Sequence, residues 1–126
     1  MEKEFIPYEQ ALALKVLGFD EPCFGGYVKL TETQNTFFMN DVISEIDRET
    51  PLHKDLITKA PLYQQAFRWF REKYELPSWI YTSNNKEFWY SILKDGRMIV
   101  RDYKPFNTYE EAELECLKKL IEIVKQ

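Results

Sequence analysis

Histidine and cysteine, the side chains that most often act as catalysts or metal ligands, are scarce in this sequence. His53 is the single histidine and lies in a polar run between Pro51 and Lys54, where an imidazole is typically solvated. The two cysteines, Cys23 and Cys116, are too far apart to form a metal-binding motif. Because the chain begins with no export signal, both are expected to be free thiols in a reducing cytoplasm. The sequence therefore predicts no metal site.

Paired carboxylates and glycine-rich turns are the other patterns that could indicate catalysis. Asp41 with Glu45, or Asp47 with Glu49, could pair as an acid and a base, but eleven acidic residues among the first 60 make such pairs common. Residues 24–27 lack the glycine spacing and the terminal lysine of a phosphate-binding loop. We therefore expect a protein that is not an enzyme, with no catalytic residue and no cofactor.

Charge is distributed unevenly along the 126 residues. The net charge is −4, and residues 1–60 carry six basic and eleven acidic side chains, whereas residues 61–126 carry eleven and ten. A negative protein repels nucleic-acid phosphates, which disfavours non-specific binding. The charged start contains no apolar signal segment, and the apolar runs are far shorter than a bilayer span. We expect a cytoplasmic protein that does not enter a membrane, folded as a single domain over residues 1–126.

The chain is expected to open with a short amphipathic helix. Pro7 suits the first turn of a helix, where its missing N–H has no partner to lose. The apolar periodicity continues to Leu17, and Gly18 is well placed to close the helix in a left-handed conformation. Phe19 is then expected to fold back on the last turn.

A hairpin is expected after this helix. Residues 20–26 contain proline and paired glycines and predict a loop, and residues 27–30 and 36–39 predict two antiparallel strands. In the stretch 40–60, Asn40 could cap a short helix over residues 41–46, but Val42 and Ile43 suit a strand equally well. The acidic N-terminal part, residues 1–60, is thus predicted to be a helix plus a hairpin.

The second half, residues 61–126, predicts the order helix, strand, strand, strand, helix. Asp95-Gly96 between two strands is a strong hairpin signal, because both turn residues need a positive φ. Thr108 and Glu111 form a capping box at the start of the last helix. The apolar face of that helix is too wide for one neighbour, so we expect it to contact the sheet and also a second helix or subunit. The predicted elements cover residues 61–74, 79–82, 86–94, 97–103 and 108–124.

The predicted fold class is α+β, with an antiparallel sheet whose helices pack on one face and whose other face is covered by the N-terminal helix and hairpin. The α-β-β-β-α order is that of the double-stranded-RNA-binding domain, whose last helix begins with a lysine cluster. Here the matching residues 108–113 are acidic, and residues 83–86 replace that family's Gly-Pro-x-His loop. The topology is similar but the charges are not, so RNA binding of that kind is not expected.

A regular two-residue hairpin would fix which side chains share a face of this sheet. The face that contains Trp89 and Leu93 is the one we expect the helices to cover. The opposite face combines aromatic and basic side chains and is the candidate interaction face: Phe88, Tyr90, Lys94, Arg97, Arg101 and Tyr103. We expect the first 60 residues to cover this face at least in part. If they do not, it is a binding surface for a protein or for a stacked nucleic-acid strand.

Three stretches resemble a group of small proteins carried by bacterial prophages and mobile elements: FIPYEQALALKVLGFDEPC at residues 5–23, APLYQQAFRWFREKY at 60–74 and YEEAELECLKKLIEIVK at 109–125. They touch both ends and the middle of the chain, so the resemblance covers nearly its full length. The sequence departs from the group's pattern at Gly25-Gly26, where a bulkier residue usually follows the first glycine. The resemblance implies a cytoplasmic accessory protein and no particular site residue.

These observations support three hypotheses. The leading one is a non-enzymatic module that binds a host or phage protein, and a homodimer through the C-terminal helix is its simplest version. The alternative is a nucleic-acid-binding module that uses the candidate interaction face. A third is a small-molecule pocket lined by Trp69, Trp79 and Trp89.

Overall fold

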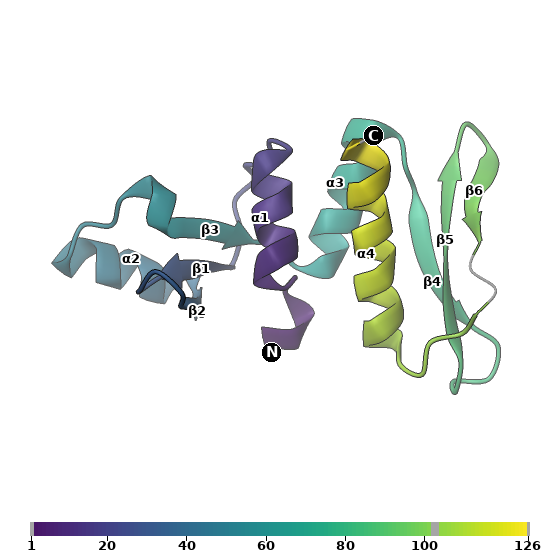
Figure 1. Cartoon of the computed structure of the whole chain (residues 1–126), viewed down its shortest axis with the longest axis horizontal. Helices are drawn as coiled ribbons and strands as arrows, with labels where there is room; N and C mark the ends of the chain where they lie inside the picture. The colour runs from purple at the N-terminus through teal and green to yellow at the C-terminus, as the bar shows by residue number, and fades with distance from the viewer. Residues whose placement is uncertain (1, 102–103, 126) are drawn as a thin grey trace. The chain divides into compact units, whose positions relative to one another are not determined.

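The computed structural model describes residues 2–101 and 104–125, with the side chain of Arg101 excepted. The chain divides into two compact units, Met1–Leu62 and Tyr63–Gln126. Their helices and strands are labelled in Figure 1. Both units combine α-helices with an antiparallel sheet, so the predicted α+β class is confirmed.

The N-terminal unit is built on a three-stranded antiparallel sheet with the strand order β2-β1-β3. Its elements are α1 (Tyr8–Val16), β1 (Gly25–Lys29), β2 (Asn35–Met39), α2 (Asn40–Glu49) and β3 (Ile57–Ala60). The predicted helix and the β1–β2 hairpin are confirmed. For residues 41–46 the helix was the correct alternative, although Met39 is its N-cap and no side chain caps it. Strand β3 at the end of this stretch was not predicted.

The end of α1 has the predicted closure. Gly18 has a φ of 98°, and its N–H donates to the carbonyl of Lys15 at 3.1 Å. The N–H of Phe19 donates to the carbonyl of Leu14 at 2.9 Å, which completes a Schellman motif. Phe19 and Leu14 are both buried, so the motif folds the chain back onto the unit's core.

The Gly25-Gly26 pair lies in β1, so its prediction as part of a loop was wrong. A Cβ atom at Gly25 would lie 2.6 Å from Cζ of Phe37, and one at Gly26 would lie 3.2 Å from Cδ1 of Ile43 in α2. Because successive strand residues point to opposite faces, β1 is packed on both faces. Glycine at these positions permits close packing, which is one of the few reasons for glycine inside a strand.

The C-terminal unit has the predicted order of elements. They are α3 (Tyr63–Tyr74), β4 (Ser78–Thr82), β5 (Phe88–Lys94), β6 (Arg97–Arg101) and α4 (Tyr109–Lys125). The sheet is antiparallel with the order β4-β5-β6. The predicted third strand extended to residue 103, and its last two residues lie outside the described part of the chain.

Helix α4 packs on β5 and β4 and also contacts α3, and Figure 1 shows both helices on the same side of this sheet. The apolar side chains that it buries are Ala112, Cys116, Leu117, Leu120 and Ile121. The expectation that this helix contacts the sheet and a second helix is therefore confirmed. Its wide apolar face needs no second subunit to cover it, which removes the reason for placing a homodimer interface there.

Local hydrogen bonds define the turn and the helix start in this unit. Asp95 and Gly96 have φ values of 53° and 77°, as the hairpin signal predicted. The hydroxyl of Thr108 accepts a hydrogen bond from the Glu111 N–H at 3.1 Å. Glu111 Oε2 accepts from the N–H of Asn107 at 3.3 Å rather than from that of Thr108, so the capping box is shifted by one residue.

The β5–β6 pairing is irregular, and here the predicted register was wrong. Leu93 pairs with Met98 as expected, but the next pair is Ile92 with Val100. Ile99 is therefore an extra residue, a β-bulge that shifts all later partners by one position. Val100, which follows the bulge, therefore lies on the face opposite to the one predicted.

Helix α4 covers the sheet face with Phe88 and Tyr90, which the first 60 residues were expected to cover. Tyr90 is only 6% exposed and Ile92 is fully buried. The ring of Phe88 lies 6.1 Å from that of Tyr109 in α4, edge to face. The prediction that the first 60 residues cover this face was therefore wrong, because α4 of the same unit already covers it.

Candidate functional site

The face of the C-terminal sheet that points away from α4 is the candidate site. Alternation along the strands places five large side chains on it, and we call them the outer sheet face: Trp79, Tyr81, Trp89, Leu93 and Met98. Tyr81 is paired with Trp89 across β4 and β5, and Leu93 is paired with Met98 across β5 and β6. Three adjacent strands thus supply one continuous surface.

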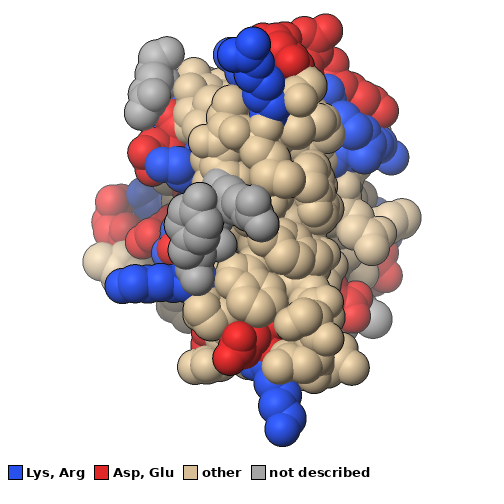
Figure 2. All heavy atoms as spheres, turned by 90° about the vertical axis from the view of Figure 1, so that its right-hand side faces the viewer, with Lys and Arg blue, Asp and Glu red and all other residues tan. Residues whose placement is uncertain are grey.

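This surface combines a rigid aromatic pair with exposed apolar side chains. The rings of Tyr81 and Trp89 are stacked, with centroids 5.7 Å apart and planes 17° from parallel. Trp79 is 41% exposed and Met98 is 51% exposed. Figure 2 shows this side of the sheet as a broad uncharged band, with Lys, Arg, Asp and Glu mainly at its margins. The outer sheet face is therefore apolar in composition but not basic.

The six residues predicted to form one interaction face are divided between several places. Phe88 and Tyr90 lie on the helix side, where Tyr90 is stacked on Phe106 at 6.1 Å between ring centroids. Tyr90 is buried, so it is not available for the stacking that was expected only if this face were left uncovered. The remaining four residues have other positions.

Lys94 and Arg97 are paired at the exposed end of the β5–β6 hairpin. The backbone of Arg101 is paired with Ser91, whereas the regular register had paired Arg101 with Tyr90. Tyr103 lies outside the described residues. Of the predicted set, the structure therefore brings together Lys94 and Arg97. The exposed aromatic surface is instead the outer sheet face, which the helices were predicted to cover.

The three tryptophans do not form the proposed small-molecule pocket. Trp69 is buried on α3, where its ring contacts Phe70 at 5.1 Å and Tyr74 at 5.4 Å between centroids. Trp79 and Trp89 lie on the outer side of the sheet, away from the helices. The hypothesis of a pocket that all three line was therefore wrong.

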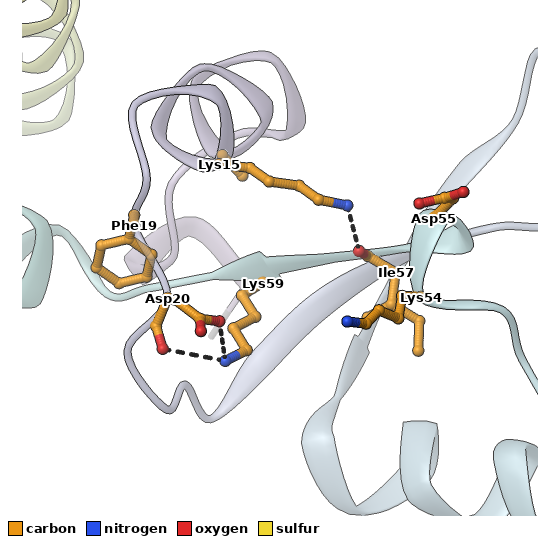
Figure 3. Close-up of a pocket in the computed structure, with 8 residues that line it drawn as sticks. Lys15, Phe19, Asp20, Lys54, Asp55, Ile57 and Lys59 are labelled. Atoms are coloured by element: carbon orange, nitrogen blue, oxygen red, sulfur yellow. Dashed lines mark hydrogen bonds and ion pairs between the residues drawn. The ribbon is translucent and has the colours of Figure 1, made fainter.

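A cavity of about 420 Å³ lies in the N-terminal unit, beside the edge strand β3. Its walls come from α1, from the residues that close this helix, from the turn before β3 and from β3 itself: Ala11, Lys15, Phe19, Asp20, Lys54, Asp55, Ile57 and Lys59. Figure 3 shows the lysine side chains extending from these separate elements. No local sequence pattern predicts this cavity, because its residues are distant in the chain.

Several polar side chains of the cavity have defined partners. Lys59 Nζ donates to Asp20 Oδ1 at 2.9 Å, and this hydrogen bond and the lysine charge lower the pKa of Asp20 (Figure 3). Lys15 Nζ donates to the carbonyl of Ile57 at 3.1 Å (Figure 3). Asp55 lies 3.3 Å from Nδ1 of His53, which is exposed as the sequence predicted.

The two thiols are poorly suited to nucleophilic chemistry. Burial raises the pKa of Cys116 to about 12 and that of Cys23 to about 11, so both are protonated at neutral pH. Within residues 2–101 and 104–125 the structure contains no cluster of three or more His, Cys, Asp or Glu side chains that could hold a metal ion. In the same residues, no helix is both long enough and apolar enough to cross a bilayer.

Comparisons with protein-family profiles, with curated proteins and with solved structures found no match to this chain.

Proposed function

We propose that this chain is a non-enzymatic interaction module that binds another protein through the outer sheet face. In keeping with the resemblance to prophage proteins, we place it in the bacterial cytoplasm as an accessory protein of a phage or mobile element. The observation that carries the proposal is the contrast between the two faces of one sheet. Helix α4 covers the face with Tyr90, whereas the opposite face leaves Trp79 and Met98 exposed.

The composition of the outer sheet face supports a protein partner. Aromatic side chains and methionine are enriched at the centres of protein interfaces, and charged side chains are depleted there. Tryptophan and tyrosine are also frequent among the residues that dominate binding energy. The stacked Tyr81–Trp89 pair is already ordered, so binding there loses little side-chain entropy.

A nucleic-acid strand is disfavoured by the position of the charges. Bases could stack on Trp79, but the affinity of such complexes depends on cations that follow the phosphate backbone. Lys94 and Arg97 lie together at the hairpin end, and Figure 2 shows the Lys and Arg side chains of the described residues mainly at the margins of the uncharged band. The net charge of −4 adds to this disadvantage. Nucleic-acid binding is therefore an alternative outcome of the test.

The test is affinity capture of the full chain from lysate of a bacterial host, with and without nuclease. Trp79→Ser and Met98→Ser remove the two most exposed members of the outer sheet face, and Leu30→Ser is a matched control. Leu30 lies in the other unit and is 51% exposed, the same fraction as Met98. We expect captured protein to survive nuclease, to persist with the control, and to fall at least about tenfold with Trp79→Ser.

Two results would contradict the proposal. Loss of all captured material on nuclease treatment would identify a nucleic-acid binder instead. Equal capture by all three variants and the unmodified chain would show that the outer sheet face does not take part in binding. Circular dichroism of each variant separates loss of binding from loss of fold.

A further inference from the structure

We propose that the cavity beside β3 binds a small organic phosphate. In this assignment Lys15, Lys54 and Lys59 surround the phosphate, and Phe19 and Ile57 contact the organic group. This cavity belongs to the N-terminal unit, and ligand binding there is independent of the function proposed for the outer sheet face.

The size and lining of the cavity suit a small ligand. Its volume of about 420 Å³ falls within the range of known ligand pockets. Ala11 and Phe19 are buried and Ile57 is half-buried, so they provide an apolar wall. The lysines and aspartates supply the polar groups that would fix the orientation of a ligand.

The cavity gathers cations in a region of the sequence that is otherwise acidic. Residues 1–60 contain six basic side chains against eleven acidic ones, and three of those six line this one cavity. They come from α1, from the turn over Lys54–Leu56 and from β3. Positive charge is therefore concentrated here by the fold rather than by a basic stretch of sequence.

The carboxylates do not neutralise all three lysines. Asp20 is paired with Lys59, and Asp55 lies against His53. Among the described residues, neither Lys15 nor Lys54 forms an ion pair with a carboxylate. Three lysines against two aspartates leave the lining with one positive charge in excess, and in the described part of the chain the ammonium groups of Lys15 and Lys54 have no ion pair of their own. They suit a phosphomonoester, which carries a charge of about −1.5 to −2 at neutral pH. Lysine is also a frequent phosphate ligand in proteins.

A structural role explains only part of this arrangement. Lys15 binds the Ile57 carbonyl, and a lysine over an edge strand protects it from pairing with another chain. That role does not require Lys54, which makes no comparable hydrogen bond among the described residues. Lys54 is therefore the residue whose substitution best separates ligand binding from protection of the edge.

The experiment is a titration of the full, ¹⁵N-labelled chain with phenyl phosphate, followed by amide chemical shifts. We expect saturable shifts at Lys15, Phe19 and Lys59. Lys54→Gln should weaken binding about tenfold, the loss of one charge-assisted contact. Lys29→Gln is the matched control, because Lys29 is in the same unit, 3.8 Å from Glu32 and outside the cavity lining.

Parallel titrations identify which part of the probe is recognised. Phenol tests the organic group alone, inorganic phosphate tests the anion alone, and both should bind more weakly than phenyl phosphate. No saturable shift at these amides up to about 10 mM phenyl phosphate would overturn the proposal. Equal weakening by Lys29→Gln and Lys54→Gln would also overturn it, because binding would then follow net charge alone. Phenol binding as tight as phenyl phosphate would exclude the phosphate contact.

Discussion

Glu113 on α4 is expected to destabilise the folded protein above neutral pH, and replacing it with glutamine should remove that penalty. Partial burial is the main reason that its pKa is raised to about 7, and the nearby charge of Glu110 adds to it. The folded protein therefore binds a proton at Glu113 more readily than the unfolded chain does. Its stability should fall as the pH rises from about 4.5 to about 7, and the full penalty should remain above that range.

The size of the penalty follows from the difference between the two pKa values. A change from 4.5 to about 7 would correspond to roughly 3 kcal/mol for a fully desolvated group. Glu113 is only half-buried, so solvent screening reduces the expected effect to about 1 kcal/mol. Glu113→Gln should thus be more stable than the unmodified chain by about 1 kcal/mol at pH 8 and equally stable near pH 4.5.

Tryptophan fluorescence during urea unfolding is a suitable assay, because all three tryptophans lie in the C-terminal unit with α4. Glu115→Gln is the matched control, since Glu115 is on the same helix and is paired with Lys118 at 3.0 Å. Its loss should cost no more than about 0.5 kcal/mol and should not stabilise the protein at any pH. A Glu113→Gln variant with the same stability gain at pH 5 and pH 8, or with no gain at pH 8, would refute the explanation by desolvation.

One substitution and one thiol reaction test the packing inside each unit. Gly25→Ala should destabilise the N-terminal unit by about 1–3 kcal/mol, because the new Cβ would lie 2.6 Å from the Phe37 ring. Amide hydrogen exchange would measure this loss of stability. Unchanged protection of the β1 amides would contradict the packing described. Cys116 should not react with Ellman's reagent at pH 8 in the native state, since it is fully buried with a pKa of about 12. Rapid labelling of Cys116 at a denaturant-independent rate would show that this face of α4 is not packed against the sheet as described.

Features determined by a few neighbouring residues could be predicted from the sequence. Gly18 closes α1 as expected, because a left-handed residue after an apolar turn has few alternatives to glycine. Asp95-Gly96 likewise gives the expected hairpin turn. The order of elements in the C-terminal unit follows from such local signals together with hydrophobic periodicity.

Features that depend on distant contacts could not be predicted in the same way. The bulge at Ile99 leaves no mark in the sequence, yet it shifts the later β6 pairings by one residue and places Val100 on the opposite face. Both faces of β5 are rich in large apolar residues, so composition could not decide which one α4 covers. Gly25 was predicted to lie in a loop because its sequence neighbours do not show why a glycine is needed there. The reason is the Phe37 ring of the neighbouring strand, which leaves no room for a Cβ atom.

The cavity beside β3 is a second example of this limit. Lys15, Lys54 and Lys59 come together only because α1 lies beside β3, a strand that the sequence analysis did not predict. The one signal in the sequence was that basic residues are few in the acidic residues 1–60. A cluster of three of them in the folded protein therefore indicates a site for an anion.

The central claim is that the outer sheet face contacts another protein, and photo-crosslinking in living host cells tests it most directly. A benzophenone amino acid would replace Trp79 on the outer sheet face, and the same group at Leu30 would serve as the control at an exposed position in the other unit. We predict a discrete protein adduct from position 79 that is missing from position 30. Adducts to nucleic acid alone, or the same adducts from both positions, would contradict the claim.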